Sequence, residues 1–178
     1  MRTTRPWFDP LFVTVAIGLY AADQLTKAWV LRTLGPGAER HSLQIVGDYV
    51  RLSYTTNTGA AFGIFQNQPL VFTLIAVVAI PTIWLFNRNM SPQTLFTRIC
   101  LGALLGGALG NLTDRLRLGR VTDFIDVGIG DLRWPAFNIA DSAFVVGIFA
   151  LTVVVFLLEQ GRRSSPDGQQ PRGESRYA

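Results

Sequence analysis

Histidine and cysteine are almost absent from this chain of 178 residues, which has one of each, His41 and Cys100. A single cysteine excludes a disulfide framework within the chain, and one histidine with one cysteine cannot build the usual kind of zinc site. A serine or cysteine nucleophile would have to use His41, which lies in a loop without a supporting motif. We therefore expect no metal and no cofactor, and we expect Cys100, inside an apolar run, to pack between helices.

The basic residues also lack the clustering that a nucleic-acid-binding surface needs. The formal net charge is +4 and the isoelectric point is near 9.8, but the arginines are scattered beside apolar runs, without a basic stripe or an aromatic platform. Anionic lipid headgroups are the simpler partner for such arginines. We expect membrane lipids and no nucleic acid among the partners, and we expect a monomer.

Long apolar runs dominate the sequence, because 49% of the residues are hydrophobic and the mean hydropathy is +0.30. Such a chain is too apolar for an ordinary soluble domain. A helix of about 20 apolar residues crosses a bilayer, and the runs at 11–31, 70–86, 95–112 and 139–158 are of this kind. The sequence predicts an all-α integral membrane protein with four transmembrane helices in one domain, 11–160, between an N-terminal segment, 1–10, and a disordered tail, 161–178.

Two of these runs carry features that predict how the helices pack. Asp23 and Lys27 stand four residues apart in the first run, so they share a helix face, where pairing reduces the cost of placing charges near the membrane. We assign this pair a structural role. In the third run, Gly102, Gly106 and Gly110 repeat at intervals of four, which predicts a flat helix face that packs tightly against a neighbour.

A different pattern follows the first run. Glycine and proline at 35–37 break the helix, and Val50, Leu52 and Tyr54 then alternate with polar residues. This period of two predicts a short strand. The next residues, Asn57–Gly63, are rich in glycine and alanine, and alone they favour a turn followed by a return to the membrane.

Four carboxylates gather in residues 119–144, next to the last apolar run. If Asn138 caps the final helix, Asp141 lies in its first turn and faces the positive end of the helix dipole. Asp123 lies in a segment of strand or loop character and could fold back to meet Asp141. Two carboxylates in contact share one proton, so that one acts as base and the other as acid, as in an aspartic protease. The alternative is that Asp141 only caps the helix, while Asp123, Asp126 and Asp131 lie in a solvated loop.

Three blocks of this sequence together resemble one known family. They are GGALGNLTDR (Gly106–Arg115), the pattern V-x-D-x-I-D at 121–126 and the pattern F-N-x-A-D at 137–141. In this order and at this spacing they are similar to the lipoprotein signal peptidase family, also called signal peptidase II, and the likeness covers about residues 11–160. The resemblance implies an aspartic endopeptidase whose catalytic dyad is Asp123 and Asp141.

The resemblance also implies the substrate and the residues around the dyad. It implies cleavage of lipid-modified prolipoproteins immediately before the diacylglyceryl-cysteine. Residues from about 35 to 66 become a small extracytoplasmic β-sheet platform and loop that holds an extended peptide. Asp114 matches the family motif too, but we assign it a structural role. Active-site support or substrate contacts fall to Asn57, Gly59, Asn111, Arg115 and Asn138.

The orientation in the membrane depends on the first helix. Lysines and arginines divide evenly between the two sides of a four-helix arrangement, but Arg2 and Arg5 before the first run favour termini in the cytoplasm. The dyad then faces the outside of a bacterial cytoplasmic membrane, in agreement with the family. The other function class is a non-enzymatic four-helix transporter or assembly protein. It would need ionisable groups near mid-bilayer in several spans, whereas Asp123 and Asp141 cluster at one boundary.

Overall fold

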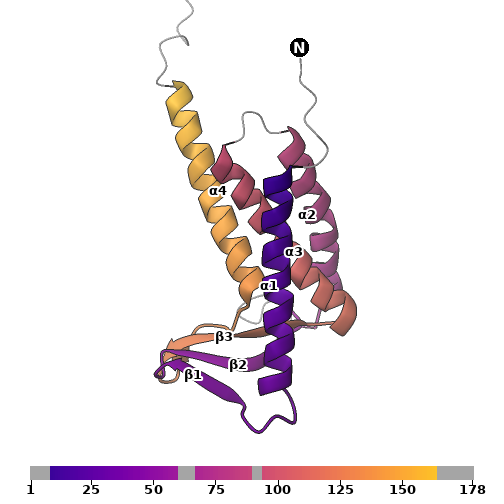
Figure 1. Ribbon diagram of the computed structural model, residues 1–178, viewed down its shortest axis with the longest axis vertical. Helices are drawn as coiled ribbons and strands as arrows, with labels where there is room; N and C mark the ends of the chain where they lie inside the picture. Colours follow the sequence, from indigo (N-terminus) through magenta and orange to yellow (C-terminus); the bar gives the residue numbers. More distant parts are fainter. Residues whose placement is uncertain (1–8, 60–66, 90–93, 164–178) are drawn as a thin grey trace, which may run out of the picture.

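Helices and a small sheet make up the protein, as the computed structural model shows for residues 9–59, 67–89 and 94–163. The helices in this part of the chain are α1 (Pro10–Leu34), α2 (Pro69–Asn89), α3 (Leu95–Leu118) and α4 (Ile139–Arg163). Its strands are β1 (Ser42–Val46), β2 (Val50–Asn57), β3 (Val121–Ile129) and β4 (Leu132–Arg133). The helices form a bundle, and the sheet lies across one end of it (Figure 1).

Within the described residues, three helices have the length and hydropathy to cross a membrane, namely α2, α3 and the part Ile139–Leu157 of α4. α1 lies outside this group because polar side chains in its second half, among them Asp23, Gln24 and Lys27, lower its hydropathy. In the apolar window of α3, 56% of the residues are buried, against 6% in α2. α3 is therefore the central helix, and α2 turns most of its apolar surface outward, as a lipid-facing helix does.

The glycines of α3 let it pack closely on α1, as their spacing predicts. A Cβ atom on Gly102 would lie 2.7 Å from the carbonyl oxygen of Phe12, and one on Gly106 would lie 2.6 Å from that of Ala16. Both distances are shorter than a van der Waals contact, so a larger residue would push the two backbones apart. Cys100, also on α3, is buried, in agreement with its predicted packing role.

The sheet is antiparallel, with the strand order β1-β2-β3-β4. It includes the strand predicted at Val50–Tyr54, but it is not confined to residues 35–66, because β3 and β4 complete it. A hairpin of two strands is only marginally stable alone, which explains why β1 and β2 pair with a strand from elsewhere in the chain. Asp123 and Asp126 are strand residues rather than members of a solvated loop, whereas Asp131 lies in an exposed turn.

A second apolar cluster attaches the sheet to the helices. Val30 and Leu34, at the end of α1, are buried with Phe124 of β3, and Ile125 packs against them. Ile125 also forms a β-bridge with Phe137, just before α4 begins. These contacts bring the acidic strand β3 to the end of the bundle, beside the first turn of α4.

Helix α4 is longer than its apolar run predicts. It extends to Arg163 instead of ending near residue 158, so the first residues of the expected tail, 161–163, are helical. The remainder of that tail, 164–178, lies outside the described residues, as do residues 1–8 and residues 60–63 of the glycine- and alanine-rich segment. The cytoplasmic placement of the two ends stays a prediction.

Candidate active site

Asn138 and Asp141 cap the N-terminus of α4 reciprocally. The backbone N–H of Asp141 donates to Oδ1 of Asn138 at 2.8 Å, and the backbone N–H of Asn138 donates to Oδ2 of Asp141 at 3.2 Å. The predicted cap is thus present, and it has the hydrogen-bond pattern of a capping box. It holds the Asp141 carboxylate in the first turn, where the helix dipole favours a negative charge.

Two asparagine side chains connect Asp141 to Asp123. Nδ2 of Asn138 donates to Oδ1 of Asp123, and Nδ2 of Asn111 donates to Oδ1 of Asp141, both at 2.7 Å. Asn138 also donates to Oδ1 of Asn111 at 3.2 Å. Asp123 is only 2% exposed, and Asn138 is completely buried. Residues from α3, β3 and the start of α4 therefore converge on one pair of carboxylates.

The pKa of Asp123 is raised to about 7, first by burial and then by the negative charge of Asp141. Hydrogen bonds from Asn57 and Asn138 and the positive charge of Lys27 act in the opposite direction without offsetting it. A carboxyl group with this pKa is largely protonated at slightly acidic pH and half protonated near neutrality. The two carboxyl groups can therefore hold one proton between them, which is the state that acid and base catalysis by such a pair requires.

Both carboxylates line an open cavity of about 540 Å³, within the size range of ligand-binding pockets. The sheet and the ends of α2, α3 and α4 enclose it. Its walls include three more of the predicted residues, Asn57, Gly59 and Arg115. Much of the remaining wall is apolar and includes Phe72, Trp134, Val145 and Val146. The arrangement suits a peptide whose polar backbone reaches the carboxylates while its apolar parts contact the bundle.

Arg115 stands between this cavity and a smaller one of about 220 Å³ among α2, α3 and α4, which Asn111 and Asp141 also line. The guanidinium of Arg115 lies over the ring of Phe72, 5.3 Å from its centroid. Its Nη1 donates to the backbone oxygen of Asn111 at 3.5 Å. A permanent positive charge is thereby placed at the boundary between polar and apolar walls.

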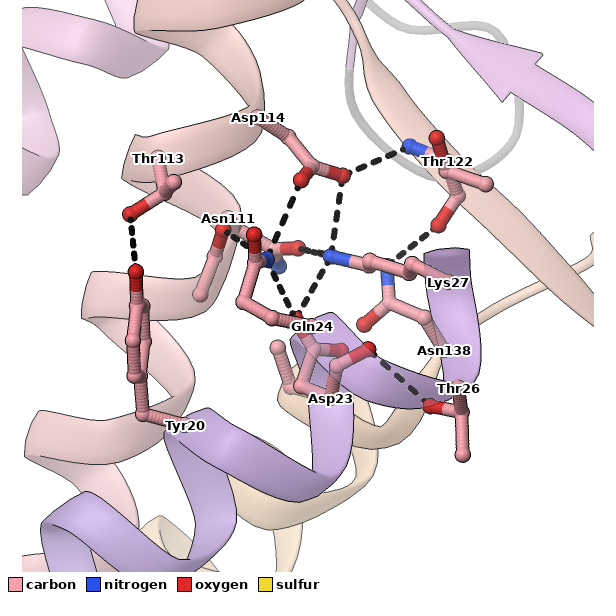
Figure 2. A network of polar contacts seen from close by, with 12 residues as sticks. Tyr20, Asp23, Gln24, Thr26, Lys27, Asn111, Thr113, Asp114, Thr122 and Asn138 are labelled. Carbon is pink, nitrogen blue, oxygen red and sulfur yellow. Dashed lines mark hydrogen bonds and ion pairs between the residues drawn. The ribbon is translucent and has the colours of Figure 1, made fainter. Parts of the chain in front are cut away.

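A buried ion network, drawn in Figure 2, adjoins the carboxylate pair through Asn111. Nζ of Lys27 lies 2.8 Å from Oδ2 of Asp23, so the pair that the spacing of four residues predicts is present. The same ammonium lies 3.0 Å from Oδ2 of Asp114 and donates to Oδ1 of Asn111 at 3.0 Å. Asn111 thus joins the network to Asp141. Within the residues that the structure describes, no group of three histidine, cysteine or acidic side chains could hold a metal ion.

Gln24 and Thr122 belong to this network, although neither is among the predicted site residues. Nε2 of Gln24 donates to Oδ1 of Asp114 at 3.1 Å and to Oδ2 of Asp23 at 3.2 Å. The backbone N–H of Thr122 donates to Oδ2 of Asp114 at 3.0 Å, and that of Ala140 donates to Oδ1 of Asp23 at the same distance. The network therefore ties α1, α3, β3 and α4 together. For Gln24, the sequence shows a polar amide beside Asp23 in an apolar run. Thr122 contacts Asp114 through its backbone, so its side chain gives no signal in the sequence.

Known proteins are similar to this chain over most of its length. The family model described as Signal peptidase (SPase) II matches residues 15–157. A lipoprotein signal peptidase of Moorella thermoacetica is 40% identical over 153 residues, which are 85% of this chain and 97% of that protein. One from Syntrophotalea carbinolica is 39% identical over 141 residues, or 78% of this chain and 86% of the relative.

A solved structure shares the fold as well. It is described as a bacterial membrane enzyme, determined by the in meso method at 2.3 Å resolution, and its TM-score to this chain is 0.75 at 26% sequence identity. The match covers 93% of this chain and 98% of that one. From this agreement in sequence, fold and apolar helices, we conclude that the chain belongs to the signal peptidase II family and is a membrane protease.

Proposed function

We propose that this protein is an aspartic endopeptidase that removes signal peptides from lipid-modified prolipoproteins, cleaving immediately before the lipidated cysteine. The observation that carries the catalytic type is the pair Asp123 and Asp141, which line one cavity and are linked by two asparagine side chains. The substrate class is supported by family membership and by relatives that are lipoprotein signal peptidases.

In the proposed mechanism, Asp141 is the base and Asp123 is the acid. Asp141 accepts hydrogen bonds from the side chain of Asn111 and the backbone of Asn138 at a helix N-terminus, and these donors stabilise its ionised form. Asp123 has a pKa raised to about 7 and carries the shared proton. Asp141 then deprotonates a water that attacks the scissile carbonyl, while Asp123 donates to the developing oxyanion and later helps protonate the leaving amine.

The other residues support these two. We assign Asn57 and Gly59, at the end of β2, and Arg115 to substrate binding, because all three line the cavity with the carboxylates. Asn111 and Asn138 orient the carboxylates through their hydrogen bonds. The structural roles fall to Asp23, Lys27 and Asp114, whose two carboxylates share one ammonium group away from the cavity.

The proposed setting is a bacterial cytoplasmic membrane crossed by four helices, with both termini in the cytoplasm and the dyad on the outer side. α1 serves as the fourth span because its charges are buried inside the protein, with Asp23 0% and Lys27 5% exposed, and are not presented to lipid. We propose that the protein acts as a monomer. The carboxylates lie together at one end of the bundle, which favours the protease over the alternative of a transporter or assembly protein.

Cleavage of a synthetic lipidated peptide by the purified protein tests this function. The peptide carries a diacylglyceryl-cysteine after a signal sequence, and mass spectrometry of the products locates the broken bond. We expect one cut, immediately before the modified cysteine, and we expect turnover to survive EDTA and reagents that block serine or cysteine. Turnover that EDTA abolishes and added zinc restores would contradict the aspartic mechanism.

A further inference from the structure

The sheet extends beyond the helices that support it. In Figure 1 its long strands run nearly at right angles to the helix axes and carry the β1-β2 turn and the β3-β4 turn out past the point where α4 begins. The two turns are neighbours, because the backbone N–H of Gly128 donates to the carbonyl oxygen of Tyr49 at 3.0 Å. The chemical character of the surface near these turns depends on which side chains lie on the same face of the sheet.

One face of the sheet points toward the helices. Leu52 of β2 lies opposite Leu43 of β1 and Ile125 of β3. All three pack against the cluster of Val30 and Leu34 at the end of α1. Because side chains alternate between the two faces of a strand, this row fixes which residues farther along the strands also point toward the helix side.

The same face stays apolar beyond the last helix contact. In the next row, Val50 lies between Val46 and Val127. The backbone N–H of Trp134 donates to the carbonyl oxygen of Val127 at 2.8 Å and continues this row. The outermost row pairs Ile129 with Leu132. Four of these side chains are largely exposed and form what we term the apolar overhang: Val46 (55%), Trp134 (60%), Ile129 (69%) and Leu132 (83%).

The opposite face of the same strands is polar. Arg51 lies opposite Gln44 and Asp126 in the register. Nη2 of Arg51 lies 3.3 Å from Oδ2 of Asp126, and Nε of Arg133 lies 2.6 Å from Oδ1 of the same carboxylate. The projecting part of the sheet is thus amphipathic, with ion pairs on its outer face and uncovered apolar side chains on the face toward the bundle.

We propose that the apolar overhang rests in the interfacial layer of the lipid bilayer, in the leaflet on the side of the carboxylate pair. The strands lie across the helix ends, so the apolar face that continues past them points toward the membrane rather than toward bulk water. The polar face then remains in water, and the apolar face contacts the apolar part of the bilayer interface.

The overhang is also continuous with a surface that faces lipid. Five residues after Trp134 the chain enters α4 at Ile139, and the outward residues Val145 and Val146 of this helix are 66% and 65% exposed. Trp134 therefore lies at the depth where a spanning helix begins, and tryptophan is enriched at that level of a membrane. Trp134 lines the cavity too, so the bilayer surface would form part of the cavity's rim.

Depth-dependent quenching tests this contact in the full chain. Leu132→Cys carries an environment-sensitive fluorophore, and Gln44→Cys, exposed on the opposite face, is the matched control. The unsubstituted chain reports background labelling, since Cys100 is buried. In vesicles of phosphatidylcholine and phosphatidylglycerol, we expect doxyl-labelled lipid to quench the label at 132 about threefold more than the label at 44, and iodide to show the reverse order.

Ile129→Cys repeats the measurement on the neighbouring strand, in case one substitution disturbs the turn. Iodide quenching at positions 132 and 129 equal to that at 44 would place the overhang in water and overturn the inference. Shielding from both quenchers that disappears when the protein is diluted in the vesicles would also overturn it, because a second copy of the chain would then be the cover. None of these readouts depends on catalysis.

Discussion

Two groups of buried carboxylates lie side by side in this protein, and their negative charges are stabilised in different ways. Asp23 and Asp114 share the ammonium group of Lys27, which lies 2.8 and 3.0 Å from them. Asp123 and Asp141 instead accept hydrogen bonds from asparagine amides. The ammonium group cancels one of the two buried negative charges of the first pair, whereas neutral amides only solvate those of the second, so the second pair has the greater need for a proton.

Asn111 connects the two groups and shows how one serves the other. Its Oδ1 accepts from Lys27, which leaves Nδ2 to donate to Asp141. The ion network thereby fixes which end of the amide faces Asp141. We infer that structural charges and reactive charges are separated here by one side chain, and the following substitutions test that separation.

Removing either member of the dyad should have the largest effect. Asp123→Asn and Asp141→Asn should each lower kcat on the lipidated peptide by about 10³-fold or more, because acid and base are both required. Membrane insertion should be unaffected. Initial-rate kinetics on purified protein measure the loss.

Asp126→Asn is the matched control, since this residue lies in the same strand but pairs with Arg51 and Arg133 on the outer face. Its effect on kcat should be far smaller. An inactive Asp126→Asn beside a nearly normal Asp123→Asn would mean that the wrong partner has been assigned to Asp141.

Lys27→Met should act mainly on stability. It leaves Asp23 and Asp114 buried without their common cation, and breaking a buried pair in this way costs roughly 3–5 kcal/mol of unfolding free energy. Arg98→Met removes a partly exposed pair with Asp9 at the other end of the bundle and should cost about 1 kcal/mol or less. Thermal unfolding in detergent compares them, and an unchanged Tm with abolished cleavage would make Lys27 part of the chemistry.

The sequence predicts the ion pair and the cap because both are local. Asp23 and Lys27 are one helical turn apart, and Asn138 and Asp141 are three residues apart, so helix geometry alone brings each pair together. The glycine spacing of α3 predicts its flat face for the same reason. Contacts of this kind need no knowledge of how distant segments meet.

Contacts between distant segments were harder to predict. The pairing of β2 with β3 joins residues about 70 apart in the chain, and nothing in the alternation of β2 shows which strand completes the sheet. The links from Gln24 to Asp114 and from Phe72 to Arg115 likewise depend on the bundle's packing. The roles of the site residues stay predictions.

The pH dependence of stability separates the two groups of carboxylates further. The pKa of Asp123 is raised from an ordinary 3.8 to about 7, so the folded chain binds this proton more tightly than the unfolded chain. The free energy of unfolding therefore falls as the pH rises from about 4 through 7. Asp123→Asn should raise Tm at pH 8 and flatten this pH dependence. The gain in the free energy of unfolding should be at most about 4 kcal/mol.

Asp114→Asn should act in the opposite direction and lower Tm at the same pH, because an amide keeps only one acceptor oxygen where the carboxylate contacts Lys27, Gln24 and the Thr122 backbone N–H. The two aspartates, each replaced by its own amide, thus form a direct comparison. If Asp123→Asn lowers Tm at pH 8 as much as Asp114→Asn does, both carboxylates are structural and the proposed acid is wrong.

Arg115 should show the smallest effect, and it tests whether a charge outside both groups serves the substrate. It is a cation that lines the cavity instead of joining the buried network, with its guanidinium over Phe72. At that boundary it can contact the polar part of a lipid-modified cysteine while the acyl chains stay among apolar walls. Arg115→Ala should therefore reduce the ratio of kcat/KM for lipidated over unlipidated peptide by about tenfold, while Tm changes little. Equal kcat/KM for the two peptides with the unsubstituted enzyme would mean that the enzyme does not recognise the lipid of its substrate. Arg115 would then only bind the headgroups of the surrounding membrane lipids.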